Sequence, residues 1–240
     1  MHRLLVETAL LEEPSPALPA NAAKHLRILR PKNGEEIELF DGRGRRRTYG
    51  FCASAPKDGG AASSLSAISG ISETPRPPRP LTLFACITKG SRWDWTIEKA
   101  TELGASRIVP VISERTIVRI PREERAAKRE RWVRIAEDAA RQSDAAWLPE
   151  ILPAMDFADT LGLVRQTRCL VGALTDPPSP PIATATGDAV YVGPEGDFTP
   201  GELAALMAIA TPVSFGPTIL RAETAAIFAV SVMVAKFGEK

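Results

Sequence analysis

The sequence contains very little histidine and cysteine, and this scarcity excludes several kinds of chemistry. His2 and His25 are its two histidines, so no metal site can be assembled from histidine spacing, and we expect no bound metal. Neither lies near a G-x-S-x-G motif, so a Ser-His-Asp hydrolase is difficult to build. The three cysteines, Cys52, Cys86 and Cys169, are far apart and never in C-x-x-C spacing. We therefore expect each cysteine to be a small buried apolar residue.

Long apolar runs and an excess of one charge are also missing. No stretch approaches the roughly 20 apolar residues that span a membrane. The N-terminus "MHRLLVETALLEEPSP" lacks the order of a signal peptide, because its short apolar patch is followed at once by Glu12 and Glu13. These absences predict a cytoplasmic protein without membrane association. The net charge is +1, so contacts with nucleic acid have to come from local basic patches.

Two such patches lie near the N-terminus. The stretch "GRGRRR" at 42–47 predicts a dense basic loop, and "NAAKHLRILR" predicts a short helix with basic residues three apart on one face. The arginine-rich stretch 119–142 is interleaved with Glu, which is typical of a solvated helix face. The predicted RNA contacts of the two patches are Lys24, Arg27, Arg30, Arg43, Arg45, Arg46 and Arg47.

The composition changes between residues 53 and 80. This region begins as a Pro/Gly/Ser-rich hairpin or loop and ends in "PRPPRP", a run that cannot be helical and is typical of a connector. We therefore predict two domains, residues 1–75 and 76–240. The first contains the strand-like runs "RLLVE", "EEIELFDG" and "RRTYGFCAS", which predict a small β-barrel with one or two helices.

The second part alternates strands with helices, which predicts an α/β domain with a largely parallel sheet. Strands are predicted at 81–87, 106–112, 168–174, 188–193 and 211–216, and helices at 92–104, 121–142, 200–209 and from 223 to about 237. Pro110 places its strand near an edge of the sheet or at its own end. The last helix is apolar nearly all round, so it is buried on several sides, either within one chain or partly against a second subunit.

Two consecutive strands end in Gly-Pro loops. In "YVGPEGDFTPGEL" (191–203), Thr199 and Glu202 form a capping box for the next helix, while two glycines flank Glu195 where open sheets bind ligands. "SFGPTILRAET" (214–224) repeats the pattern. Neither loop is G-x-G-x-x-G or G-x-x-x-x-G-K-[ST], so phosphate binding is poorly supported. A tight turn that simply needs glycine is the alternative.

These two loops carry a resemblance to a known family. "GPEGDFTPGEL" with "FGPTILRAETA" closely resembles the C-terminal motifs of the ribosomal RNA small subunit methyltransferase E family, in the SPOUT (α/β-knot) superfamily. Three further blocks are similar and in the same order: "KHLRILRPKNGEEIELFDGRG" (24–44), "ITKGSRWDWTIEKATELGASRIVPVISERT" (87–116) and "RWVRIAEDAARQS" (131–143). The region 53–80 is not diagnostic.

The resemblance implies both a fold and an activity. The expected fold is an N-terminal PUA-like β-barrel that helps to bind RNA, followed by a SPOUT α/β domain with a C-terminal trefoil knot, a rare exception to the unknotted-chain rule. The knot is expected to bind S-adenosylmethionine, and the enzyme to act as a homodimer. It is expected to methylate N3 of a uridine in 16S ribosomal RNA, within the 30S subunit.

The resemblance also implies site residues. The expected donor contacts are Leu174, Val192, Gly193, Pro194, Glu195, Gly196, Phe215, Gly216, Ile219, Leu220, Arg221, Thr224 and Ala225. Arg221 is the candidate for stabilising the negative charge of a uracil deprotonated at N3, and its pairing with Glu223 or with a phosphate is the alternative. Glu195 either accepts the proton or holds loop amides in place, so the base stays open.

The match has one departure, and three other functions stay open. The family commonly has Gly-Arg after "EDAARQS", where this chain has Asp144-Ala145-Ala146, so no role is carried over there. The opening "MHRLLVE" keeps Arg3, a predicted RNA contact. The alternatives are a knotted transfer-RNA ribose 2′-O methyltransferase, an inactive RNA-binding or assembly module, and an α/β nucleotide hydrolase. The helix "WTIEKATELG" with the motif "LRAETA" disfavours the first, and the missing phosphate loop disfavours the last.

Overall fold

The computed structural model describes residues 1–53 and 63–238 and divides into two compact units. The first unit comprises Met1–Arg76 together with Ala140–Leu148, and the second comprises Pro77–Ala139 and Pro149–Lys240. The division after Arg76 lies next to the predicted boundary, whereas nothing in the sequence indicated that 140–148 belongs to the first unit. Part of the expected Pro/Gly/Ser-rich hairpin or loop, 54–62, lies outside the described residues.

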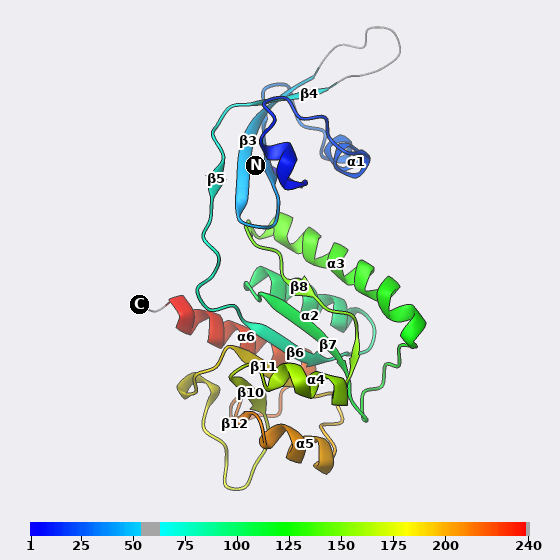
Figure 1. Cartoon of the computed structure of the whole chain (residues 1–240), viewed down its shortest axis with the longest axis vertical. Coiled ribbons are helices and arrows are strands. Elements are labelled where there is room, and N and C mark those ends of the chain that lie inside the picture. The colour runs from blue at the N-terminus through cyan, green and yellow to red at the C-terminus, as the bar shows by residue number, and fades with distance from the viewer. Residues whose placement is uncertain (54–62, 239–240) are drawn as a thin grey trace. The chain divides into compact units, whose positions relative to one another are not determined.

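The first unit is built on one sheet (Figure 1). Its elements are β1 (His2–Leu5), η1 (Thr8–Leu11), α1 (Ala20–Leu29), β2 (Glu36–Phe40), β3 (Arg45–Cys52), β4 (Ser64–Ala67) and β5 (Ser72–Glu73). The strand order is β1-β2-β3-β4, with β5 also pairing with β3. β2 and β3 form an antiparallel hairpin. In the region that was expected to begin as a hairpin or loop, Ser64–Ala67 and Ser72–Glu73 form β4 and β5, because backbone pairing with β3 does not require an apolar sequence.

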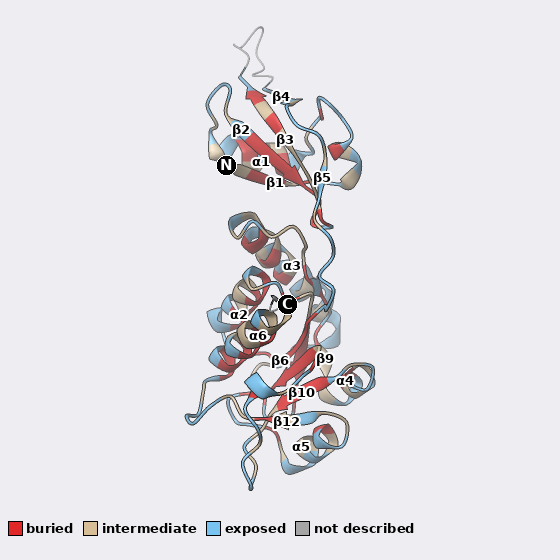
Figure 2. Ribbon diagram, turned by 90° about the vertical axis from the view of Figure 1, so that its left-hand side faces the viewer, coloured by how far each residue is buried: buried red, intermediate tan, exposed pale blue. Residues whose placement is uncertain are grey.

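The core of the first unit lies between α1 and the sheet. Ala22 and Leu26, four residues apart and therefore on one face of α1, pack with the strand residues Leu4, Leu39 and Tyr49. Figure 2 shows the buried strands of this unit in red. The helix ends at Arg30, whose φ of 49° is left-handed, immediately before Pro31.

Arg3 lies inside this unit, where the sequence predicted a contact with RNA. The residue is 7% exposed, and its Nε donates a hydrogen bond to Glu38 at 2.6 Å. Its Nη1 donates to the carbonyl of Ala140 at 2.7 Å, and its Nη2 to that of Ala145 at 3.3 Å. The guanidinium also lies 4.1 Å from the ring centroid of Phe40. The structure therefore replaces the predicted RNA contact of Arg3 with a structural role, joining β1 to the segment 140–148.

The second unit is an α/β domain whose sheet is entirely parallel, as predicted. Its strands are β6 (Thr82–Cys86), β7 (Arg107–Ile112), β8 (Glu150–Ile151), β9 (Met155–Asp156), β10 (Cys169–Gly172), β11 (Ala189–Val192) and β12 (Thr211–Val213). Its helices are α2 (Ser91–Glu102), η2 (Arg122–Glu124), α3 (Arg125–Gln142), α4 (Phe157–Val164), η3 (Ile182–Thr184), α5 (Pro200–Met207) and α6 (Ala222–Gly238). The strand order is β12-β10-β11-β6-β7-β8, with β9 also pairing with β7.

Helices cover both faces of this sheet. Leu83 and Ala85 of β6 belong to a core cluster with residues of α2, α3 and α6. Phe84 and Cys86 face the opposite way, into a cluster completed by α4 and α5. Because alternate residues of a strand point to opposite faces, a strand covered on both sides is apolar at every position. This explains the continuous apolar run at 81–87.

Pro110 lies beside a break in the neighbouring strand. β7, the strand that contains Pro110, is not itself an edge strand. β7 pairs with β6 on one side, and on the other with β8 at Arg107 and Ile108 and with β9 at Val111 and Ile112. The carbonyl of Ile108 accepts a bond from Leu152, so Pro110, two residues on, directs its missing N–H to the same side. The outer strand is interrupted there.

Two of the three cysteines follow the prediction. Cys86 and Cys169 are buried, and burial raises the pKa of each thiol to about 12, so both stay protonated at neutral pH. The prediction is wrong for Cys52, which is exposed at the end of β3. Over residues 1–53 and 63–238, the structure contains no helix with the length and apolarity that a membrane crossing requires.

The segment between β10 and β11 contacts the end of β12 from two sides. Ala173 donates a backbone hydrogen bond to Val213 at 3.1 Å, while Ser214 donates to Pro180 at 2.8 Å and accepts from Ile182 at 3.0 Å. A trefoil knot requires the chain to pass through a loop of this kind. The knot itself stays a prediction.

Candidate active site

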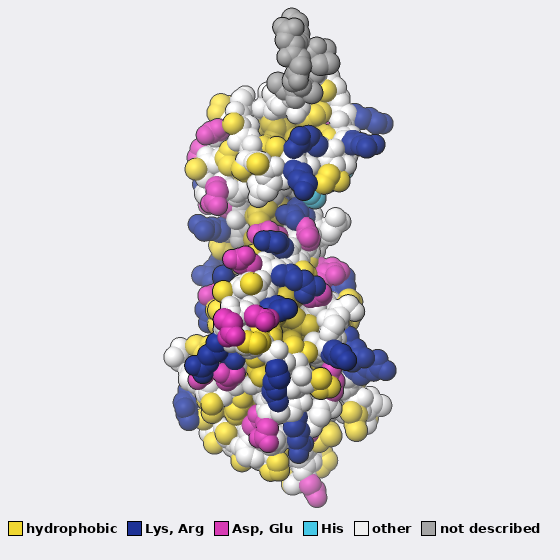
Figure 3. Space-filling view, turned by 90° about the vertical axis from the view of Figure 1, so that its right-hand side faces the viewer, with side chains coloured by type: hydrophobic (Ala, Val, Ile, Leu, Met, Phe, Trp, Pro, Cys, Tyr) yellow, Lys and Arg dark blue, Asp and Glu magenta, His cyan; other side chains and the backbone are white. Residues whose placement is uncertain are grey.

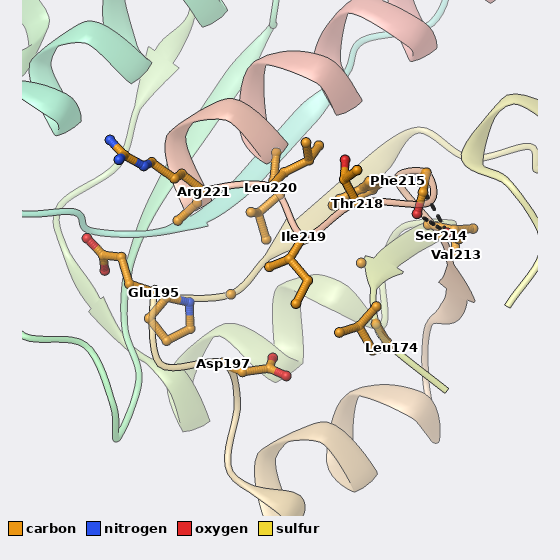
Figure 4. A pocket seen from close by; sticks show the side chains of 18 of the residues that line it. Leu174, Glu195, Asp197, Val213, Ser214, Phe215, Thr218, Ile219, Leu220 and Arg221 are labelled. Carbon is orange, nitrogen blue, oxygen red and sulfur yellow. Dashed lines mark hydrogen bonds between the residues drawn. The ribbon is translucent and has the colours of Figure 1, made fainter. Parts of the chain in front are cut away.

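A cavity of about 520 Å³ lies at the carboxyl ends of β10, β11 and β12. Its walls are three loops, at 172–174, 192–197 and 213–222 (Figure 4), and Ala225 of α6 also lines it. The carboxyl edge of an open parallel sheet is the usual place for a ligand. The two Gly-Pro loops, far apart in sequence, therefore meet at one site, and the loop after β10 completes it.

The loop after β11 is fixed at its far end by local hydrogen bonds. Asp197 turns the chain with a φ of 60°, donating its N–H to Pro194 at 3.0 Å and accepting from the N–H of Phe198 at 2.8 Å. The predicted capping box is confirmed, since Thr199 accepts from the N–H of Glu202 while its own N–H donates to the Glu202 carboxylate. The loop is thus anchored directly to the start of α5.

Glycine at the end of β10 permits the loop after β12 to approach closely. A Cβ at Gly172 would lie 2.3 Å from the ring of Phe215, so this ring packs directly against backbone. Gly216 follows with a φ of 123°, a conformation that favours glycine. Ser214 closes the turn by accepting the N–H of Gly216 at 3.2 Å. Sequence reasoning missed Gly172, although a glycine at the end of a predicted strand was the available signal.

The cavity has an apolar part and a charged end. Leu174 and Ile219 are 71% and 86% exposed, an unusual degree of exposure for large apolar side chains that line a cavity. Figure 4 shows Glu195 and Arg221 with their charged groups on the side away from Leu174. Cavities of about 300–1,000 Å³ with mostly apolar walls and a few polar groups are typical of small-molecule sites. The arrangement suits a ligand with a flat apolar part and a charged part.

The predicted donor contacts come together here with one exception. Those lining the cavity are Leu174, Val192, Gly193, Pro194, Glu195, Gly196, Phe215, Gly216, Ile219, Leu220, Arg221 and Ala225. Thr224 instead lines a neighbouring hollow, which also contains Arg221. The lining residues that sequence reasoning missed are Gly172, Ala173, Asp197, Val213, Ser214, Thr218 and Ala222.

Arg92, at the start of α2, separates two carboxylates at the charged end. Its Nη1 lies 3.7 Å from Glu195 Oε1, and its Nε lies 3.7 Å from Glu223 Oε1. Glu223 therefore faces Arg92 rather than Arg221, and no acidic group of the described residues forms an ion pair with Arg221. Within the same residues, Glu195 accepts no hydrogen bond from a loop amide. Among the described residues, neither the pairing of Arg221 with Glu223 nor the holding of loop amides by Glu195 is present, while pairing of Arg221 with a phosphate stays an open alternative.

Most of the predicted basic loop is strand with partners of its own. Arg45 contacts Glu12 at 2.6 Å and Glu73 at 3.0 Å. Arg47 donates to the carbonyls of Leu11 and Ser69, both at 2.9 Å. Arg46 lies within 4 Å of Glu38 and Asp144, at 3.8 and 3.6 Å. Arg45 and Arg46 thus lie beside acidic groups and Arg47 donates to backbone carbonyls, which weakens the expectation that these arginines bind RNA.

The basic face of α1 is more accessible. Lys24, Arg27 and Arg30 are exposed and line a shallow hollow with Ile28, and Arg43 is exposed in the β2–β3 turn. On the face of the molecule shown in Figure 3, Lys and Arg side chains are interspersed with Asp and Glu. Where acidic side chains lie among the basic ones, phosphate binding is disfavoured. The exposed basic residues of α1 and of the β2–β3 turn are therefore the stronger candidates for contacts with phosphates. Among the described residues, no group of His, Cys, Asp and Glu could hold a metal ion.

The fold and the cavity define an α/β domain that binds a small organic ligand at the carboxyl edge of its sheet. Comparison with known proteins makes the class specific. A family model described as an RNA methyltransferase domain matches residues 75–234, and one described as an RNA methyltransferase PUA domain matches residues 18–49. The first match includes every residue of the cavity. The protein is an RNA methyltransferase.

Individual relatives narrow the class further. The ribosomal RNA small subunit methyltransferase E of Synechocystis is 32% identical, over 96% of this chain and 76% of that protein. The structure of the Neisseria gonorrhoeae methyltransferase of that name, bound to S-adenosyl methionine, is 28% identical, covers 98% of both chains and has a TM-score of 0.83. A Legionella pneumophila methyltransferase structure with bound SAM is 26% identical, covers 98% of this chain and 96% of that one, and has a TM-score of 0.78. The chain belongs to the ribosomal RNA small subunit methyltransferase E family.

Arg115, in the loop after β7, is expected to position the loop after β11. Its Nη1 donates to the carbonyls of Gly196 and Phe198, at 3.0 and 3.3 Å. We expect Arg115→Ala to weaken S-adenosylmethionine binding roughly tenfold, because hydrogen bonds from a charged donor contribute about 1.5–3 kcal/mol. Titration calorimetry measures the change, and Arg122→Ala is the control, because the Arg122 side chain is 80% exposed and lies near Asp156. Equal affinities of the two variants would show that Arg115 does not position the loop.

Proposed function

We propose that this chain transfers the methyl group of S-adenosylmethionine to N3 of a uridine in 16S ribosomal RNA. The observation that carries the proposal is the single cavity in which the two Gly-Pro loops meet, with exposed apolar side chains and a charged end. Two relatives with this fold are described with S-adenosylmethionine bound. The printed name of the curated relative supports small-subunit ribosomal RNA as the substrate.

The cavity residues fit such a donor. Main-chain groups of 193–196 and 215–221 are available to satisfy the polar edge of an adenine ring, while Ile219 and Leu220 supply apolar surface for its face. Proline restricts the path of these loops before binding, which lowers the entropy lost when the ligand is oriented, and glycine lets their backbone approach the ligand closely. When bound, the donor supplies an electrophilic methyl group.

Arg221 is the proposed charge stabiliser. Uracil N3 carries a proton that must be removed for methylation. Removal of this proton leaves negative charge on the ring oxygens. Arg221 lies at the charged end of the cavity with no acidic partner among the described residues, and its guanidinium is cationic at any physiological pH. It can therefore fork onto a uracil carbonyl as charge develops there.

The remaining proposals concern partners. Lys24, Arg27, Arg30 and Arg43 are proposed to contact phosphates of the RNA, with the 30S subunit as the natural substrate. We propose a homodimer through α6, a mostly apolar helix on which the large apolar side chain of Phe228 is 39% exposed. With ribosomal RNA as the substrate, the protein is proposed to act in the cytoplasm.

The test is to map the methyl group. The protein is incubated with labelled S-adenosylmethionine and either 30S particles or free 16S RNA, and the digested RNA is analysed by mass spectrometry. We expect N3-methyluridine on particles and little label on free RNA. A ribose methyl would support a 2′-O methyltransferase instead, and efficient labelling of free RNA would overturn the 30S substrate. Failure to bind millimolar donor would support an inactive RNA-binding module.

A further inference from the structure

We propose that the hollow between the first turns of α2 and α6 receives the target uracil, and that Glu223 accepts its N3 proton. This inference rests on the proposed function and adds the substrate side of the site. It also selects Glu223 over Glu195, the carboxylate that the sequence offered as a weak candidate for the base. Four residues carry the argument: Arg92, Trp95, Arg221 and Glu223.

The hollow has the position and size that a base site needs. It has a volume of about 610 Å³ and shares Arg221 with the donor cavity, so it lies next to the charged end of that cavity. Trp95 lines it and is 42% exposed, although large aromatic side chains are usually buried. An exposed aromatic ring is the surface on which proteins stack an unpaired RNA base.

Glu223 is a buried carboxylate whose capacity to accept hydrogen bonds is not fully used. The residue is 9% exposed and lines the hollow, and its Oε1 lies 3.7 Å from Arg92. Its Oε2 is buried and has no hydrogen-bond partner among the described residues. A buried polar atom without a partner is costly, so a ligand that donates a hydrogen bond here gains that energy on binding. Glu195, in contrast, is exposed at the tip of the donor loop.

The donors and acceptors that line the hollow suit uracil better than cytosine. Uracil presents a carbonyl, the N3–H donor and a second carbonyl along its Watson–Crick edge. Glu223 is an acceptor, and Arg92 and Arg221, which line the same hollow, are donors. Cytosine presents N3 as an acceptor and an amino group beside it, so it would set a lone pair against the carboxylate. The hollow therefore selects the base whose N3 carries the proton.

The proposed step balances in protons and electrons. The N3–H proton passes to Oε2 of Glu223, and the N3 electron pair forms the new bond to the methyl carbon. The C–S bond of the donor breaks with its electron pair remaining on sulfur, which converts the sulfonium into a neutral thioether. Arg221 stabilises negative charge on the uracil carbonyl while the proton leaves.

The first experiment compares Glu223→Gln with Glu195→Gln in single-turnover methylation of 30S particles. Loss of a general base predicts a decrease of about 10²–10⁴-fold for Glu223→Gln. The N3–H of 5-fluorouridine is more acidic than that of uridine. On particles reconstituted from RNA that contains 5-fluorouridine, the rate defect of Glu223→Gln should therefore shrink at least tenfold. Glu102→Gln, on α2 but outside the hollow, is the control and should keep wild-type rates. A defect of equal size on both RNAs, or acidity-dependent rescue of Glu195→Gln alone, would overturn the role of Glu223.

The second experiment needs no methyl donor. Particles carrying cytidine in place of the target uridine are compared with normal particles in equilibrium binding. Wild-type protein should prefer uridine by roughly tenfold or more, since an unmatched buried polar group is costly. Glu223→Gln should reduce that preference, and Trp95→Ala should weaken binding of both particles by roughly tenfold or more through lost stacking, with Trp95→Phe retaining part of it. An unchanged preference in Glu223→Gln would remove the hollow as the base site.

Failure of the inference is distinguishable from failure of the proposed function. If wild-type protein methylates no uridine N3 in particles or free RNA, the function itself is wrong. If wild-type protein methylates N3 but Glu223→Gln does so at the same rate, only the assignment of the proton acceptor is wrong.

Discussion

Replacing Arg221 with alanine is expected to lower the rate of methyl transfer by about a hundredfold or more, the size typical of a lost charge stabiliser. Folding and S-adenosylmethionine affinity should stay near wild type, because Arg221 is exposed at the charged end of the cavity and forms no ion pair among the described residues. Single-turnover kinetics at saturating donor and 30S particles measure the rate, and calorimetry measures the affinity.

A role in binding phosphate would give a different result for the same variant. Loss of a phosphate contact weakens RNA binding at all sequences and makes the binding less dependent on salt. At saturating RNA, the rate of the chemical step would then recover. Arg168→Ala is the matched control, since Arg168 is exposed and pairs with Asp188 at the far end of the strands. Near-normal turnover of Arg221→Ala would remove Arg221 from the chemistry.

Replacing Arg3 with alanine is expected to destabilise the first unit by about 3–5 kcal/mol, the usual cost of breaking a buried ion pair. Glu38 would be left buried without the guanidinium that now lies 2.6 Å away, and the carbonyl of Ala140 would lose its donor. Hydrogen exchange of peptides from residues 1–53, measured in the full-length chain, should show a large loss of protection.

Two further variants make the Arg3 prediction specific. Arg45→Ala, which breaks a more exposed pair on the same sheet, should lose far less protection. Combining Arg3→Met with Glu38→Leu should be less damaging than Arg3→Ala, because apolar replacement of both partners leaves no uncompensated charge. If Arg3→Ala keeps full protection but loses RNA affinity, the original prediction of an RNA contact was the better one.

The second unit shows how far a sequence can predict a site. Apolar runs identified the buried strands, and the motifs around Gly193 and Gly216 identified the loops that line the cavity. Gly172 was missed because its importance comes from the ring of Phe215, forty-three residues later, which packs where a Cβ would be. Thr224 lines the neighbouring hollow rather than the cavity, because one residue along a helix changes the direction of a side chain by about 100°.

The basic residues of the first unit show what a sequence cannot predict. The sequence "GRGRRR" displays charge, but it does not show which acidic groups the fold brings near. Strand pairing places Glu73 beside Arg45, and the segment 140–148 brings Asp144 to Arg46. Whether an arginine is free for RNA depends on such distant neighbours.

The sequence did not predict β4, β5, β8, β9 or α4. By itself it determined the main strands and helices of the second unit, their parallel sheet and the two Gly-Pro loops that line the cavity. These follow from local rules, namely apolar periodicity, capping and the backbone demands of glycine and proline. Only the tertiary structure decided which charges remain available, that Arg3 is buried, that Glu223 keeps an oxygen without a partner, and that Arg92 separates two carboxylates. Burial and electrostatic pairing depend on distances between residues far apart in the chain, and those distances are set only when the elements pack.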